Sequence, residues 1–160
     1  MLVFPRSTKI GSIMLEILLI TFTLSLLFLA AIFDIRTRRI PNILSLIGLL
    51  GICFILILSK PFQEILPHLY SLIAMTLISM TIFYLHLIGG GDAKMLLVTA
   101  FSIPISDLLL LGLWISLVGG GQALFCMGLN RMYPKKSAGI PYAVAIFIGT
   151  ILFFVERLFF

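Results

Sequence analysis

Long apolar runs separated by short polar interruptions dominate this sequence. Hydrophobic residues make up 61% of the 160 residues and charged residues only 11%, whereas soluble domains carry about 25% charged residues. A bilayer core about 30 Å thick is crossed by roughly 20 apolar residues in a helix. The interruptions define six predicted helical spans, at residues 17–33, 42–58, 68–88, 92–103, 107–127 and 139–155. We therefore expect an all-α, polytopic membrane protein.

These runs leave no room for a sizeable soluble domain. We expect a single membrane domain over residues 1–160, with an interfacial lead-in at 1–15 and a helical bundle at 16–157. The first span is expected to be retained, because no convincing signal-peptide cleavage site follows it. Residues 62–67 are expected to form a short loop. The fourth span reaches only about 18 Å as a helix, so the turn before it dips into the membrane or its far end stops short.

The basic residues set the orientation, because cytoplasmic loops of membrane proteins are enriched in Lys and Arg. One side collects most of the eleven cations: Arg36, Arg38, Arg39, Lys94, Arg131, Lys135 and Lys136. The other side keeps Arg6, Lys9, Lys60 and Arg157. The first side is therefore expected to be cytoplasmic, with both termini outside. Asp34 ends the first span and Asp92 begins the fourth, so both acids are expected at the cytoplasmic face.

Three glycines at residues 89–91 precede Asp92 and interrupt the apolar pattern. An acid at such a place in a membrane protein is a candidate functional residue. If Asp34 and Asp92 lie together, they share one proton, as in aspartic proteases. The glycines are expected to break the helix and take positive φ, and to let a substrate backbone come close. The N-terminus of the fourth helix is expected to favour ionised Asp92, leaving the proton on Asp34.

Less specific interpretations compete at each position. Asp92 is a good helix N-cap, and Asp34 can pair with Arg38 one turn later. Lys94 is expected to extend toward the interface, while Asn42 either caps the second span or hydrogen-bonds near Asp34. The predicted site-shaping group is Gly89, Gly90, Gly91, Lys94 and Asn42.

Other residues carry weaker expectations. His68 is expected at the interface. Gly112, Ser116 and Gly120 recur every four residues and are expected to let another helix approach closely. The two histidines and two cysteines form no metal-binding pattern, so neither a metal nor another cofactor is expected. The aromatic residues lie within spans, which gives no support to nucleic-acid binding.

Three segments resemble the type IV prepilin peptidases, and especially the small form found with Flp (tight-adherence) pili: residues 34–42 (DIRTRRIPN), 89–94 (GGGDAK) and 140–149 (IPYAVAIFIG). The resemblance covers roughly residues 17–155. It implies an aspartic endopeptidase of the inner membrane, with its active site toward the cytoplasm. Such an enzyme removes a short basic leader from pilin precursors, after a glycine and just before their hydrophobic helix.

By the same resemblance, Asp34 and Asp92 match the catalytic aspartates of that family, and Gly89 and Gly91 match its glycines. Larger members carry a cytoplasmic domain with paired Cys-x-x-Cys motifs and also methylate the new N-terminus. Residues 34–42 are too few for such a domain and contain no cysteine. We therefore expect peptidase activity without methylation.

Several functions remain open from the sequence. The expected partners are a prepilin or pseudopilin precursor and membrane lipid, and the oligomeric state is left open. A second hypothesis within the peptidase class is that the chain cleaves a related precursor, such as a different pseudopilin or an archaellin-like protein. The chain could also be a small transporter or channel subunit that binds a proton or cation at Asp34 and Asp92. A third alternative is a non-catalytic assembly factor of a secretion system.

Overall fold

The computed structural model describes residues 6–132 and 142–159, and in these residues it contains helices and no strand. The elements are α1 (Arg6–Thr37), α2 (Asn42–Ser59), α3 (Phe62–Tyr84), α4 (Gly90–Phe101), the short 3-10 helix η1 (Ile105–Asp107), α5 (Leu108–Met132) and α6 (Tyr142–Phe159). The all-α prediction is confirmed. The predicted start of the last span at residue 139 and the cations Lys135 and Lys136 lie outside the described residues.

Among the described helices, five are long and apolar enough to cross a membrane. They are Ile13–Thr37, Asn42–Ser59, Phe62–Tyr84, Ile105–Gly128 and Tyr142–Phe159. The fourth predicted span is instead the 12-residue helix α4, about 18 Å long and too short for a bilayer core of about 30 Å. The chain is thus a multi-pass membrane protein, and its described residues contain five candidate spanning helices where the sequence predicted six.

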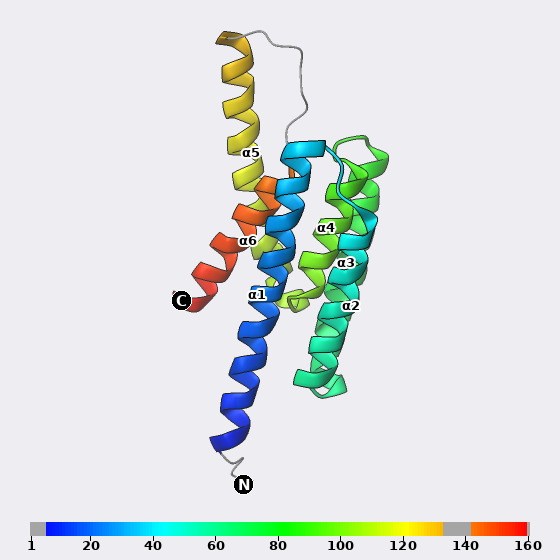
Figure 1. Cartoon of the computed structure of the whole chain (residues 1–160), viewed down its shortest axis with the longest axis vertical. Coiled ribbons are helices and arrows are strands. Elements are labelled where there is room, and N and C mark those ends of the chain that lie inside the picture. Colours follow the sequence, from blue (N-terminus) through cyan, green and yellow to red (C-terminus); the bar gives the residue numbers. More distant parts are fainter. Residues whose placement is uncertain (1–5, 133–141, 160) are drawn as a thin grey trace.

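Helix α4 lies at the centre of the bundle. It packs against α1, α2, α3 and α6 (Figure 1), and its residues from Met95 to Phe101 are buried except for Leu97. A helix that ends at membrane depth needs protein partners for its terminal backbone groups. His68 of α3 provides one, because its Nδ1 lies 3.2 Å from the Phe101 carbonyl oxygen and its Nε2 lies 3.3 Å from Lys60 Nζ. His68 is only 2% exposed, so its side chain is enclosed by the bundle.

Helix α3 differs from the prediction at both ends. It begins at Phe62 with Pro61 as its N-cap, so residues 62–67 are helical and not a loop. Pro67 is tolerated one turn into the helix, where its missing N–H removes a single hydrogen bond. The helix ends at Tyr84 and not at residue 88, because His86 takes a left-handed conformation with φ of 59°.

Two backbone hydrogen bonds close this C-terminal turn. The N–H of His86 donates to the Phe83 carbonyl at 2.9 Å, and that of Leu87 donates to the Ile82 carbonyl at 3.1 Å. This is the Schellman pattern, which satisfies the last carbonyls of a helix and reverses the chain. It brings the chain directly to the glycines before α4.

The small-residue face predicted on α5 is not the face that packs. A Cβ added at Gly112 or Gly120 would meet nothing within 4 Å. The close approach is between α5 and α6, where a Cβ at Gly149 would lie 2.7 Å from the Cα of Ile115 and one at Gly119 would touch an aromatic ring. The packing face of α5 follows the buried large residues, which include Ile115, and Gly112 and Gly120 fall beside it.

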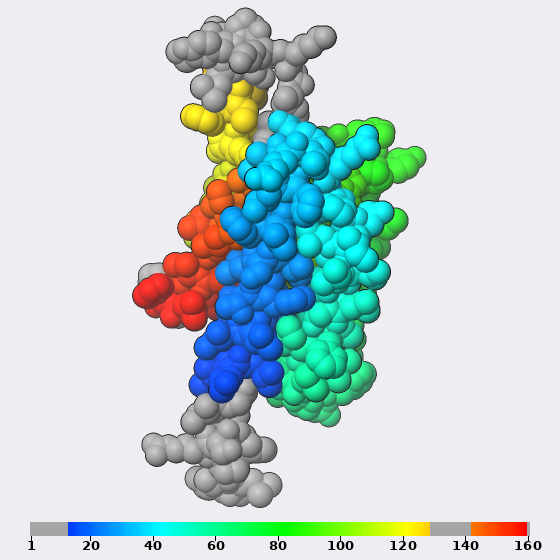
Figure 2. Space-filling view, in the orientation of Figure 1, coloured from blue at the N-terminus to red at the C-terminus, as the bar shows by residue number. Residues whose placement is uncertain are grey.

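The outer surface of the bundle is rich in large apolar side chains. In Figure 2, α1 runs down the middle of the visible face, with α2 on one side and α6 on the other. Phe28 of α1, Phe54 of α2 and Ile148 of α6 are among the exposed apolar residues. Such exposure is unusual for a soluble protein but suits helices that face lipid.

Candidate active site

The end of α1 presents Asp34 at the edge of the bundle. Arg38 follows the helix in a left-handed conformation, with φ of 55°, and its N–H donates to the Asp34 carbonyl at 3.0 Å. This single bond terminates the helix and turns the chain toward α2. The Arg38 guanidinium makes no salt bridge with Asp34 among the described residues, where Arg157–Asp107 is the one ion pair. The alternative of an Asp34–Arg38 ion pair is therefore not supported.

The Asp34 side chain lies at the N-terminus of α6. It is 8% exposed, and its Oδ2 accepts the backbone N–H of Ala143 at 3.3 Å. Ala143 is the second residue of α6, where free N–H groups and the helix dipole favour negative charge. This contact joins two segments that are 109 residues apart in the chain.

Asp92 lies in the first turn of α4, whose N-cap is Gly89. A Cβ added at Gly89 would lie 3.1 Å from Asp92 Oδ2, so the carboxyl folds back over the start of its own helix. The other oxygen, Oδ1, is buried and has no hydrogen-bond partner. Capping accounts for one oxygen only, and a buried orphan acceptor is costly unless a proton, water or ligand meets it.

The surroundings of Asp92 raise its pKa. Asp92 lies outside the five candidate spanning helices. Burial, and next the charge of Asp34, raise the pKa of Asp92 from 3.8 to about 6, while a hydrogen bond from the Gly89 backbone opposes the rise. The upward shift in the pKa of Asp92 runs against the expected assignment, which placed the ionised form on Asp92 and the proton on Asp34. The sequence did not connect the N-terminus of α6 with this site, where the Ala143 N–H donates to Asp34.

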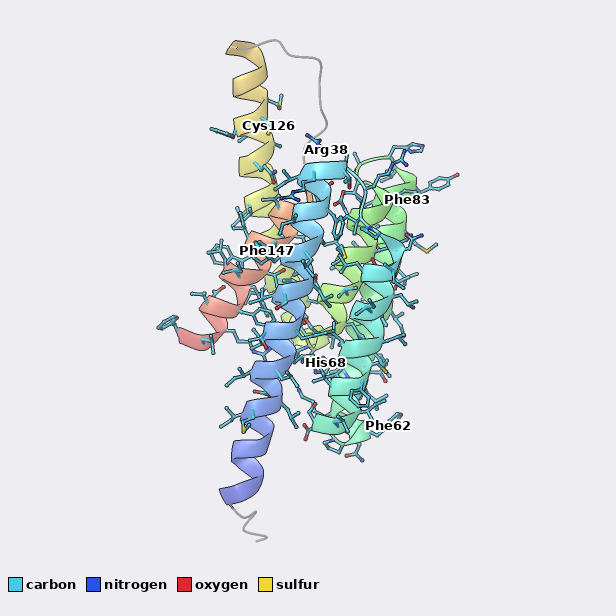
Figure 3. All side chains as sticks on the ribbon, viewed as in Figure 1. Arg38, Phe62, His68, Phe83, Cys126 and Phe147 are labelled. Atoms are coloured by element: carbon cyan, nitrogen blue, oxygen red, sulfur yellow. The ribbon has the colours of Figure 1, made fainter. Side chains whose placement is uncertain are left out.

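Both aspartates line one cavity of about 310 Å³, a volume within the range of ligand-binding pockets. Its lining residues are Asp34, Arg38, Arg39, Ile40, Asn42, Gly89, Gly90, Gly91 and Asp92. The structure thus brings together all of the predicted site residues except Lys94, which lies beside the cavity. Figure 3 labels Arg38 and Phe83 at this end of the bundle and His68 nearer the other end.

The glycines serve close packing and not a left-handed turn. No glycine in the described residues has positive φ, contrary to expectation. A Cβ at Gly91 would lie 3.1 Å from the Ile40 side chain, and one at Gly90 would lie 3.4 Å from the Phe83 ring. A side chain at Gly91 would therefore press against Ile40 in the cavity wall, whereas one at Gly90 would make an ordinary contact.

Lys94 and Asn42 connect the beginnings of α4 and α2. The Lys94 Nζ donates to Asn42 Oδ1 at 2.6 Å. Pro41 is the N-cap of α2 and no side chain caps that helix, so the capping role predicted for Asn42 is wrong. The bond holds Asn42 at the rim of the cavity.

Sequence reasoning missed the contribution of α6. Tyr142 begins this helix, and its ring lies so close to Gly119 that a Cβ there would be 2.9 Å from it. The next residue, Ala143, donates to Asp34. The segment containing Tyr142 had been recognised as a motif, but a backbone donor such as Ala143 N–H has no side-chain signature. Among the described residues, no cluster of His, Cys, Asp or Glu could hold a metal ion.

Comparison with known proteins gives one match. The family model described as the type IV leader peptidase family matches residues 21–124, which is more than half of the chain and includes both aspartates. No curated protein and no solved structure matches the chain. Helix α6 lies beyond the matched residues.

Proposed function

This chain belongs to the type IV leader peptidase family, and from that premise we propose that it is an aspartic endopeptidase with Asp34 and Asp92 as its catalytic pair. Its proposed substrate is a Flp-like type IV prepilin. The proposed site of cleavage is the cytoplasmic face of the inner membrane, where the short basic leader leaves the membrane-embedded helix. The observation that carries this proposal is the shared cavity of the two aspartates, with one buried carboxyl oxygen lacking a partner.

In the proposed reaction, ionised Asp34 acts as the base and protonated Asp92 as the acid. A water adds to the scissile carbonyl carbon while it passes one proton to Asp34, and Asp92 donates its proton to the carbonyl oxygen. The resulting gem-diol then collapses: the C–N bond breaks, Asp34 donates its proton to the leaving amine, and a diol proton returns to Asp92. This division of roles follows general acid–base catalysis by paired carboxyls.

Two features of the site support these roles. The Ala143 N–H bound to Asp34 stabilises a carboxylate that must accept a proton. The raised pKa of Asp92 keeps a proton available for the carbonyl oxygen. The glycines at 89–91 contribute three positions without side chains to the cavity wall, which suits an extended peptide backbone.

The charge of the cavity bears on how a basic leader is attracted. Arg38 and Arg39 line the cavity, and they repel a basic peptide. The attraction must therefore come from the carboxylates and from anionic lipid, which collects basic segments at the cytoplasmic surface. We assign the two arginines to lipid phosphates and not to the leader.

The test is coexpression with a candidate Flp-type precursor, followed by mass measurement of the precursor's N-terminus. Asp34→Asn and Asp92→Asn should each lower cleavage by about a thousandfold or more, as expected when one member of a catalytic pair is lost. Asp107→Asn is the matched control, because Asp107 pairs with Arg157 and does not line the cavity. Full cleavage by either active-site variant would reject the proposal. A transporter would instead lose ion flux and leave precursor processing unchanged.

A further inference from the structure

A second cavity opens beside the aspartates, between α2 and α4. Its volume is about 530 Å³, and its lining residues are Asn42, Ile43, Ser45, Leu46, Leu49, Lys94 and Leu97. Asn42 lines both this cavity and the one that holds the aspartates. We call the second cavity the α2–α4 groove.

The polarity of the groove changes along its length. Asn42 and Lys94 lie at the end next to the aspartates and are hydrogen-bonded to each other. Ser45 is turned inward and donates to the Met95 sulfur. The rest of the wall is apolar, and its residues Ile43 and Leu46 are exposed on a spanning helix. A segment that fits such a groove is polar where it leaves the catalytic cavity and apolar beyond that point.

We propose that the α2–α4 groove binds the apolar helix of the precursor, in the part that directly follows the scissile bond. This inference rests on the proposed function. It adds the position of the bound substrate and the part of the substrate that the enzyme recognises. The argument is continuity: a peptide bond placed at the aspartates has Asn42 as its neighbour, and the groove leads from Asn42 into the membrane. The leader occupies the aspartate cavity, and the helix that follows occupies the groove.

The length of the groove determines how many residues of the substrate helix can contact it. Along α2 it extends from Asn42 to Leu49, about 10 Å of helix axis at 1.5 Å per residue. A substrate helix packed alongside contacts it over about two turns, at positions three to four residues apart. The recognised feature is therefore an apolar face within roughly the first seven residues after the cut, and the remainder of the substrate helix lies in lipid.

The first experiment separates binding from chemistry. Leu46→Trp fills the groove, and Ile47→Trp adds the same bulk on the neighbouring face of α2. The two positions are matched, because Leu46 is 52% exposed and Ile47 is 49% exposed, and only Leu46 lines the groove. With purified protein and precursor in lipid vesicles, Leu46→Trp should raise KM about tenfold, equivalent to about 1.4 kcal/mol of binding, with kcat unchanged. Ile47→Trp should change neither.

The second experiment tests the contact directly and does not depend on tolerance of tryptophan. In an Asp92→Asn background with Cys53 and Cys126 replaced by Ala, a cysteine is placed at residue 46 or, as the control, at residue 47. Single cysteines are placed in turn after the cleavage site of the precursor. Residue 46 should form disulfides at helically spaced positions within roughly the first seven, and residue 47 should form none.

The outcomes separate this inference from the proposed function. If wild-type protein cleaves the precursor but Leu46→Trp leaves KM unchanged and residue 46 forms no cross-link, the groove proposal is overturned and the peptidase stands. If photoreactive lipid labels the groove equally with and without precursor, lipid is its occupant and the proposal is likewise overturned. If wild-type protein never cleaves the precursor, the peptidase assignment itself fails.

Discussion

The proton on Asp92 leads to a specific prediction about the pH dependence of cleavage. Asp92 must be protonated to act as the acid, and burial together with the charge of Asp34 raises its pKa to about 6. Above that pH, its protonated fraction falls tenfold per unit, to about one-tenth at pH 7 and about one-hundredth at pH 8. The rate of the chemical step is expected to fall in the same proportion.

The assay is a single-turnover measurement in vesicles, with enzyme in excess over precursor, so that product release does not mask the chemical step. The protonation state is read independently from the infrared band of the neutral carboxyl, which should disappear near pH 6 and be absent in Asp92→Asn. In Asp34→Asn, the band should disappear at a lower pH, because the second cause of the raised pKa has been removed while burial remains.

Two results would refute this reasoning. One is a single-turnover rate that stays constant or rises between pH 6 and 8. The other is a neutral carboxyl band that is unchanged in Asp92→Asn but lost in Asp34→Asn, because the proton would then belong to Asp34.

The same titration acts on folding: the pKa of Asp92 is higher in the fold than its ordinary 3.8, so its contribution to the free energy of unfolding is present below pH 4 and is lost as pH rises through 6.

Three further predictions follow from the packing and from the short connection between α1 and α2. Gly149→Ala should lower the free energy of unfolding by about 1–3 kcal/mol, because the added Cβ meets the Ile115 backbone. Gly120→Ala is the control and should be nearly neutral. Equal melting temperatures of the two variants in detergent would contradict the α5–α6 packing. Gly91→Ala should reduce cleavage, because the added Cβ presses on Ile40. The double variant with Ile40→Ala should recover part of the cleavage activity. If the double variant shows no recovery in the cleavage assay, the contact with Ile40 is excluded as the cause. Mature pilin should acquire no labelled methyl group from a methyl donor, and transfer of label in a radiometric assay would contradict the prediction.

Much of this architecture was predictable because a membrane constrains a sequence strongly. Apolar runs at residues 42–58 and 107–127 identify helices by composition alone, and they agree closely with α2 and α5. The shortness of α4 was also readable, since Gly89 and Pro104 delimit it. Helix ends were less predictable. Arg38 and His86 take left-handed conformations, which are uncommon for residues other than glycine, so their turns depend on the chain around them.

The sequence by itself determined that the chain is helical and membrane-embedded, and it singled out Asp34 and Asp92, because hydrophobic periodicity and an acid in an apolar setting are local properties. Tertiary structure alone placed the start of α6 beside the site, since Ala143 reaches Asp34 from 109 residues away through a backbone N–H. It also decided that Gly149, and not Gly120, lies at the helix crossing. Contacts of this kind depend on how helices rotate against one another, and every residue type carries the same backbone groups, so composition does not reveal them.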